Sequence, residues 1–225
     1  MNGYNPFAVP DAPLHVGRPR VRFAATEILH LAGAVVVLTL CFTLARDGRP
    51  FPQRLLPEPI TLLGSALAVG SGFTLHELAH KVVAQRYGHW AEFRAQFGNL
   101  LLSYLLVAST GILFATPGAV LIQGRVTPRE NGIISLVGPA VNFVIAAAVW
   151  PFTWVTDTDT PLQRVLGVVA YANALLCVFN LIPVGPLDGR KVMRWNGFVY
   201  AASVLLAVGL FVCILLGPDV LNPGK

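Results

Sequence analysis

The stretch VLGVVAYANALLCVFNLIPVGPL, residues 165–187, has no charged side chain and exceeds the roughly 20 residues that a helix needs to cross a membrane. Uncharged runs of the same kind lie at 131–156 and 195–218, and the uncharged run 60–75 leads into His76. A further apolar run at 24–45 carries Glu27 and His30 near one end. Hydrophobic residues make up 55% of the 225 residues and charged residues only 12%, about half the charged share of a soluble domain. The sequence therefore predicts an all-α polytopic membrane protein with five to six transmembrane helices.

Residues 99–117 decide between five and six helices. Gly111 and Pro117 interrupt this apolar run, and Ala119–Ile122 has the composition of a short strand. Residues 99–126 could therefore form a re-entrant or short β segment, which membrane depth allows where protein or water covers the backbone. If 99–117 does not cross and the N-terminus is cytoplasmic, most of the 16 Lys and Arg residues lie inside; a crossing divides them evenly. The positive-inside rule favours five spans.

The net charge of +5 does not indicate a nucleic-acid partner, because the basic residues lie at the ends of apolar runs, where they orient a protein in a lipid bilayer. The three cysteines lie within apolar runs without CxxC spacing, so neither disulfides nor a thiolate metal site is expected. The start of the chain lacks the pattern of a cleaved signal peptide. We expect a cytoplasmic tail at 1–22, one membrane-embedded domain at 23–218 and a tail at 219–225, with domain segments at about 60–87, 99–124, 131–154, 165–189 and 195–217.

The strongest chemical signal is His76-Glu77-Leu78-Ala79-His80. On a helix, positions i and i+4 share a face, so both imidazoles can reach one metal ion, and Glu77 projects beside it as a general base. Ionisable side chains within a membrane span cost free energy and usually serve a function. The alternative is that residues 76–80 only mark the end of the helix.

Two histidines do not complete a catalytic zinc site, which needs three protein ligands and an open position. Asp188 is the candidate third ligand, because it follows the uncharged run 165–187 and reaches a comparable depth if there are five spans. Pro183, Gly185 and Pro186 can break the helix and turn the carboxylate inward. On spacing alone, Asp188-Gly189 could also be an ordinary helix-ending turn.

Three motifs together resemble the site-2 protease family of intramembrane zinc metalloproteases. They are His76-Glu-Leu-Ala-His80, Gly138-Pro139-Ala-Val-Asn142, and Asn180-x-x-Pro183-x-x-x-Leu187-Asp188-Gly189. The resemblance covers roughly residues 60–195. The sequence departs from the family pattern in the longer stretch between the first two motifs, which leaves substrate gating and regulation open.

The resemblance implies that one Zn²⁺ is held by His76, His80 and Asp188, with Glu77 as the general base and acid. Asn142 and Asn180 would line the site and hold substrate backbone or the developing oxyanion. The implied function is cleavage of transmembrane segments of other membrane proteins near the cytoplasmic face, as in regulated intramembrane proteolysis. A multi-pass protein of a prokaryotic plasma membrane is the simplest expectation, and its oligomeric state is open.

Two other classes of function compete with this interpretation. Intramembrane His, Glu and Asp also mark the pathways of metal or proton transporters, although no inverted repeat is visible in this chain. A relative without catalytic activity could bind transmembrane partners, but Glu77 and all three candidate ligands are present.

Overall fold

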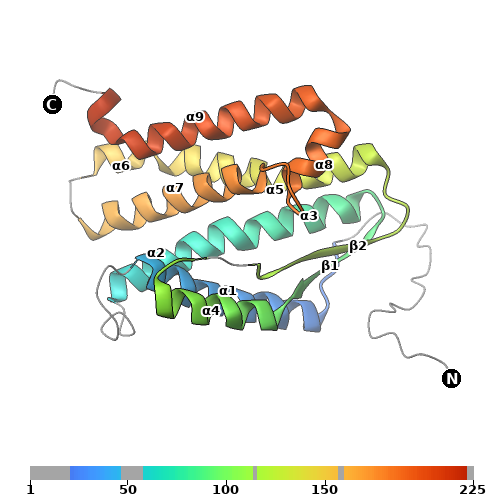
Figure 1. The fold of residues 1–225 in the computed structure, drawn as a ribbon, viewed down its shortest axis with the longest axis horizontal. Coiled ribbons are helices and arrows are strands. Elements are labelled where there is room, and N and C mark those ends of the chain that lie inside the picture. The colour runs from blue at the N-terminus through green and yellow to red at the C-terminus, as the bar shows by residue number, and fades with distance from the viewer. Residues whose placement is uncertain (1–20, 47–57, 114–115, 157–159, 222–225) are drawn as a thin grey trace.

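The computed structural model describes residues 21–46, 58–113, 116–156 and 160–221. Its helices lie roughly alongside one another, and a two-stranded hairpin lies against them near one end of the bundle (Figure 1). Helix α5 is central and contacts α3, α7 and α8, while α1 contacts α2, α4 and β1. The elements are α1 (Ala25–Arg46), α2 (Pro59–Val69), η2 (Gly70–Thr74), α3 (Leu75–Arg86), β1 (Trp90–Ala95), α4 (Phe97–Thr110), β2 (Gly118–Gln123), α5 (Pro128–Val149), α6 (Phe152–Val155), α7 (Pro161–Asn180), α8 (Asp188–Trp195) and α9 (Gly197–Leu221).

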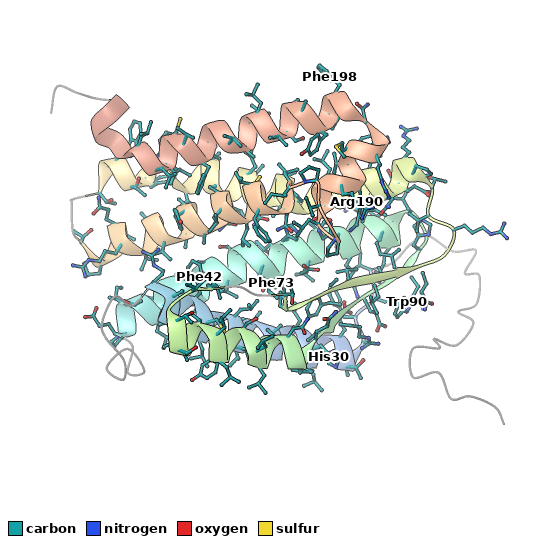
Figure 2. All side chains as sticks on the ribbon, in the orientation of Figure 1. His30, Phe42, Phe73, Trp90, Arg190 and Phe198 are labelled. Atoms are coloured by element: carbon teal, nitrogen blue, oxygen red, sulfur yellow. The ribbon has the colours of Figure 1, made fainter. Side chains whose placement is uncertain are left out.

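Four helical segments of the described chain are long and apolar enough to cross a membrane, fewer than the five to six predicted: Ala25–Arg46, Pro128–Val155, Pro161–Asn180 and Gly197–Gly217. The last segment buries only 6% of its most apolar window within the protein. Phe198, for example, is 83% exposed and points away from the bundle (Figure 2). An apolar helix with so little protein around it is suited to contact with lipid.

The predicted short β segment is confirmed, and its partner is a strand that the sequence did not reveal. β2 pairs antiparallel with β1, with Gly118 opposite Ala95 and Gln123 opposite Trp90. The backbone N–H of Gln96 also donates to the carbonyl of Pro117 at 2.9 Å. Both ends of the segment that joins the two strands are therefore held together, and α4 follows directly after β1.

Local sequence accounts for the ends of the helices near the hairpin. Thr127 and Glu130 form a capping box at the start of α5: the Thr127 side chain accepts the Glu130 N–H at 3.2 Å, and the Glu130 carboxylate accepts the Thr127 N–H at 2.8 Å. Pro128 suits the first turn, where its missing N–H has no intrahelical partner. Helix α4 ends at Gly111, whose φ of 76° is one that glycine adopts readily.

Helix α3 reaches the centre of the bundle through a widened turn. The π-helix η2 joins α2 to α3, so the backbone stays helical from Pro59 to Arg86. Buried side chains from α1, η2, β1 and α4 pack together beside this turn: Ala34, Phe73, Phe93 and Leu100. Phe73 and Phe93 meet edge to face, with ring centroids 5.6 Å apart. This packing anchors the hairpin against the helix that carries the histidines.

Candidate metal centre

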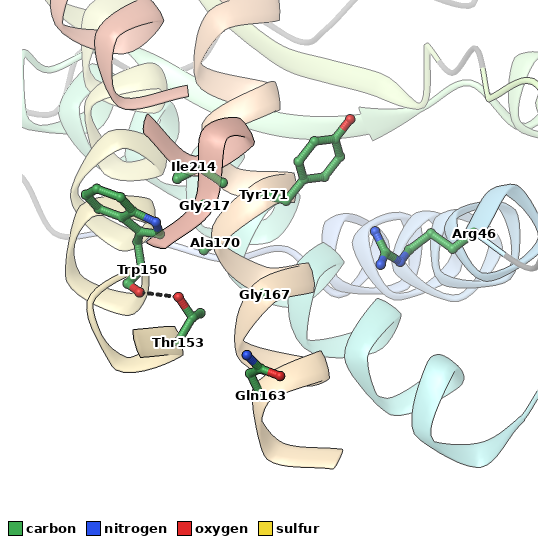
Figure 3. Close-up of a pocket in the computed structure, with 9 residues that line it drawn as sticks. All are labelled: Arg46, Trp150, Thr153, Gln163, Gly167, Ala170, Tyr171, Ile214 and Gly217. Atoms are coloured by element: carbon green, nitrogen blue, oxygen red, sulfur yellow. Dashed lines mark hydrogen bonds between the residues drawn. The ribbon is translucent and has the colours of Figure 1, made fainter. Parts of the chain in front are cut away.

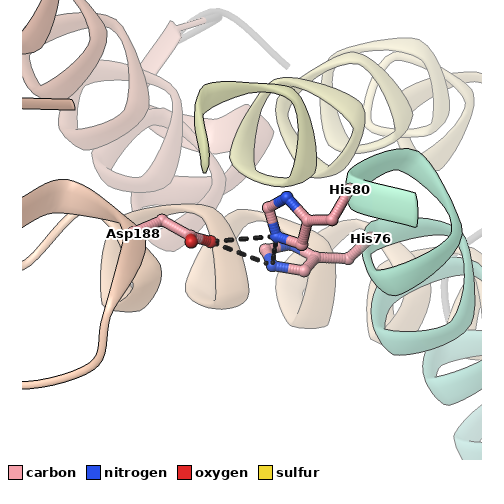
Figure 4. Close-up of side chains that lie close together, drawn as sticks. All are labelled: His76, His80 and Asp188. Atoms are coloured by element: carbon pink, nitrogen blue, oxygen red, sulfur yellow. Dashed lines mark hydrogen bonds and ion pairs between the residues drawn. The ribbon is translucent and has the colours of Figure 1, made fainter. Parts of the chain in front are cut away.

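The structure brings His76, His80 and Asp188 together in one buried cluster (Figure 4). The Nε2 atoms of the two imidazoles, one helical turn apart on α3, lie 2.9 Å from each other. The Asp188 Oδ2 atom, at the start of α8, lies 3.3 Å from His76 Nε2 and 3.1 Å from His80 Nε2. Among the described residues this is a group that could hold one metal ion.

The hydrogen bonds on the far side of each ring set the tautomers. His80 Nδ1 lies 2.6 Å from the backbone carbonyl of Ile134, which can only accept, so Nδ1 carries the proton. His76 Nδ1 lies 2.6 Å from Asn142 Oδ1, which is likewise an acceptor because the Asn142 amide nitrogen donates elsewhere. Both Nε2 atoms therefore face the carboxylate as lone pairs when the rings are neutral. Two lone pairs and an anion converging in a buried space favour a cation between them.

The separations suit a small tetrahedral ion. Nitrogen and oxygen ligands held about 2.0–2.1 Å from tetrahedral zinc lie roughly 3.3 Å from each other. The three ligand-atom separations in the cluster are 2.9, 3.1 and 3.3 Å. Two histidines and one carboxylate leave the fourth position open, as a catalytic zinc site requires.

Two glycines of the sequence motifs allow the helices to approach this closely. A Cβ atom on Gly138 of α5 would lie 2.5 Å from His80 Nε2 and 2.7 Å from His76 Cε1. A Cβ atom on Gly189 would overlap the backbone carbonyl of Leu181. Gly138 therefore makes room for the imidazoles, and Gly189 lets the first turn of α8 lie against the end of α7.

The turn between α7 and α8 directs Asp188 toward α3. Helix α7 ends at Asn180, and the chain turns through residues 181–187 before α8 begins at Asp188. Gly185 lies within the turn with a φ of 58°, and Pro183 is exposed there. The Lys191 ammonium lies 3.3 Å from Asp188 Oδ1 and its side chain is 39% exposed, so this side of the cluster lies near the protein surface.

An amide network holds the His76 ring from behind. The Asn142 amide donates to the carbonyl of Gly72 in η2 and to Asn173 Oδ1, both at 3.0 Å. The Asn173 amide in turn donates to Ser71 Oγ at 3.1 Å. A π-helical turn frees backbone carbonyls from the regular helical ladder, and such turns are frequent at functional sites. Second-shell partners of this kind orient metal-binding histidines.

The two asparagines singled out in the sequence occupy different positions. Asn142 is fully buried and bonds to His76. The Asn180 amide donates to the Leu176 carbonyl one turn earlier in its own helix, at 3.0 Å, and makes no hydrogen bond to the described cluster. Asn173 was missed by the sequence analysis, because a single asparagine within an apolar run carries no motif.

Glu77 lies on the neighbouring face of α3, beside β2 rather than among the three ligand atoms. Its side chain is partly buried, and its carboxylate lies near the backbone of Val120. The predicted base is thus within one residue of a candidate ligand and in contact with the strand. Pro139, also in the motif, is buried within α5 next to Gly138.

A separate cavity of about 330 Å³ lies elsewhere in the bundle (Figure 3). The cavity is lined by residues outside the histidine–aspartate cluster: Arg46, Trp150, Thr153, Gln163, Gly167, Ala170, Tyr171, Ile214 and Gly217.

Trp150 and Trp154, near the end of α5, stack edge to face with ring centroids 4.8 Å apart. Tryptophan side chains are enriched at membrane interfaces.

Comparison with known proteins finds relatives named as zinc metalloproteases. The chain is 34% identical over 195 residues to the protein named Putative zinc metalloprotease MJ0611 of Methanocaldococcus jannaschii, covering 86% of this chain and 97% of that protein. It is 28% identical to the Putative zinc metalloprotease YwhC of Bacillus subtilis, over 64% of this chain and 71% of the relative.

A second protein of Methanocaldococcus jannaschii, Zinc metalloprotease MJ0392, is 29% identical over 63% of this chain but only 38% of its own length. No family model matches the chain. No solved structure matches it either.

Proposed function

This chain belongs to the zinc metalloprotease family of these relatives, and we propose that it is an intramembrane protease of the site-2 type that cuts transmembrane segments of other membrane proteins. The observation that carries the proposal is the buried convergence of two histidine Nε2 atoms and one carboxylate, with Glu77 on the adjacent face of the same helix. All of these groups lie within a bundle of apolar helices.

In this proposal His76, His80 and Asp188 hold one zinc ion. That ion supplies a Lewis acid that polarises the scissile carbonyl and lowers the pKa of a water molecule to about 7. Glu77 takes the proton of the attacking water and delivers it to the leaving amine. Asn142 and the Ile134 carbonyl keep the two imidazoles in the tautomer that presents Nε2 to the ion.

Peptide hydrolysis consumes water, which the hydrocarbon core does not supply. The partly exposed Lys191 beside Asp188 marks the side from which water reaches the cluster. Helices α3 and α7 both run toward this end of the bundle (Figure 1), which supports a common depth for the motifs they carry. We take the continuous helix Pro59–Arg86 as a fifth membrane-spanning segment, residues 99–117 as re-entrant and the N-terminus as cytoplasmic.

A substrate helix hides its carbonyls in internal hydrogen bonds, so it must unwind before it can be cut. The β2 strand offers a template for the unwound segment, because it lies beside Glu77 and can accept a further strand. Helix-breaking residues near the cut should therefore favour cleavage.

The test is cleavage of a model transmembrane substrate by the purified protein in detergent. We expect Glu77→Gln to lower kcat by about 10²-fold or more, the range for loss of general acid–base catalysis, while zinc stays bound. A chelator should abolish cleavage, and added zinc should restore it.

Two results would contradict the proposal. A protein without bound zinc would show that the cluster is not the metal centre. One zinc ion per chain without cleavage of any substrate in a varied panel would favour a transporter or a non-catalytic relative.

A further inference from the structure

The two outer edges of the β1–β2 hairpin differ in how they are covered. Phe93 lies opposite Val120, and the Phe93 N–H donates to Glu27 Oε1 on α1 at 3.0 Å rather than to β2. In an antiparallel ladder, pairs that do not bond to each other point their backbone groups outward on both strands. The backbone groups of Val120 therefore point outward on the β2 side.

Side chains close the outer edge of β1. Besides the bond from Phe93 to Glu27, the Ala95 N–H donates to His30 Nδ1 at 3.2 Å. The Gln85 amide of α3 donates to the Ala91 carbonyl at 3.0 Å. Ala91, Phe93 and Ala95 alternate along the strand, so each of the three has one outward group satisfied by a side chain. This edge is occupied and cannot pair with another strand.

The outer edge of β2 lies toward the face of α3 that carries Glu77. The Glu77 carboxylate lies near the Val120 backbone. Within the described part of the chain, no side chain is hydrogen-bonded to the backbone of Ile122, the next outward position. An incoming strand that paired with Val120 and Ile122 would meet the Glu77 carboxylate at this edge.

Glu27 also connects the hairpin to the turn of α3 that follows Glu77. Its carboxylate forms an ion pair with Lys81, and the two residues are 1% and 0% exposed. Lys81 lies four residues after Glu77, on the same face of α3, and its ammonium is 4.4 Å from the ring centroid of Phe23. A buried ion pair adds little net stability compared with apolar residues of the same size. A role in fixing geometry therefore accounts better for its presence.

We propose that Glu27 and His30 of α1 are substrate-positioning residues. By capping β1 and anchoring it to α3 through Lys81, they leave only β2 open to a substrate strand and hold that open edge over Glu77. The proposal rests on the proposed function, because it takes strand addition of the substrate as its premise. Neither side chain contacts the reacting atoms, so both act through the hairpin.

Two double variants separate the cap from the ion pair. Glu27→Gln/Lys81→Met removes both buried charges but keeps an oxygen that can accept the Phe93 N–H. Glu27→Met/Lys81→Met removes the charges and the acceptor together. His30→Asn and His30→Leu form the same contrast at Ala95. Glu92→Gln is the matched control, because Glu92 pairs with Arg94 on its own strand at 2.5 Å and caps neither edge.

The zinc-loaded proteins are compared by bound zinc, by amide hydrogen exchange at Phe93 and Ala95, and by KM and kcat on the model transmembrane substrate. We expect hydrogen exchange to be at least tenfold faster at the Phe93 amide in Glu27→Met/Lys81→Met and at the Ala95 amide in His30→Leu. Their KM should rise about tenfold while kcat changes less than threefold and zinc stays at one per chain. The variants that retain an acceptor, and Glu92→Gln, should stay within threefold of wild type both in amide exchange and in KM.

Three results would overturn the proposal. Equal effects of the Gln and Met double variants would show that the cap contributes nothing. A fall in kcat at constant KM, or loss of zinc, would assign Glu27 to support of the metal centre. Faster exchange with unchanged KM would show that the hairpin does not position the substrate.

Failure of the proposed function is distinguishable, because it would appear as absence of cleavage by wild type. The affinity of the zinc-loaded wild type for the model transmembrane peptide then replaces KM. Affinity that is unchanged when the cap is removed would overturn the proposal as well.

Discussion

The candidate metal centre depends on Gly138 because this residue has no Cβ atom. A methyl group at this position would lie 2.5 to 2.7 Å from atoms of both imidazoles, so the rings or α5 would have to move. We predict that Gly138→Ala lowers zinc affinity by at least tenfold, which is measured by competition with a chelator. Gly209→Ala in α9 is the control, because nothing lies within 4 Å of a Cβ atom there. Equal zinc affinity in both variants would refute this role for Gly138.

Asn142 and Asn180 differ in what they hold, so their loss should have different consequences. Asn142 accepts from His76 Nδ1, whereas the Asn180 amide bonds within its own helix. Loss of a second-shell partner typically costs 10–100-fold in metal affinity or activity. We predict such a loss for Asn142→Ser and less than a threefold change in zinc affinity for Asn180→Ser. The reverse order would show that the network behind His76 is not what orients the ring.

Among single residues, the sequence predicted the three candidate ligands but not the amide network behind His76. The spacing of His76 and His80 on one helical face, together with a buried Asp188, was enough to expect three groups that meet. The role of Asn173 could not be inferred, because its partners Asn142 and Ser71 come from other helices. Such contacts depend on how helices pack, which a single apolar run does not reveal.

Among the elements, β2 offers a test of strand addition. The Val120 N–H points away from β1, so Val120→Pro removes an outward donor without breaking the ladder. Leu121 lies in the pair that bonds to β1, so Leu121→Pro should disrupt the hairpin itself. We predict that Val120→Pro raises KM about tenfold with zinc content unchanged, as measured by substrate kinetics in detergent. Unaltered cleavage by Val120→Pro would remove strand addition from the mechanism.

The long helices could be predicted from the sequence because long uncharged runs have few alternatives to a membrane helix. β1 was not readable, because its six residues mix apolar and charged side chains and gain their structure from β2 and from α1. The π-helical turn η2 likewise has no signature in its sequence. Both features arise from tertiary contacts, and both lie next to the candidate site.

For the whole molecule, bound zinc should stabilise the fold by connecting distant parts of the chain. The candidate ligands come from α3 and α8, and helices α4, α5, α6 and α7 lie between these two in the sequence. An ion that binds only the folded state at 1,000 times its Kd adds about 4.1 kcal/mol to the free energy of unfolding. We predict that chelation lowers Tm in detergent by several degrees and that zinc restores it. An unchanged Tm in a protein shown to have lost its zinc would contradict this linkage.

The difference between the two hairpin edges has a consequence for where a substrate can be cut. Along β2 only every second residue turns its backbone outward, so a paired peptide can shift only in steps of two if its side chains are to keep their orientation. Substrate positions relative to the cut would then be fixed in steps of two residues. Inserting two residues upstream of a cut should keep the same side chains facing the protein, whereas inserting one residue should turn them to the opposite face.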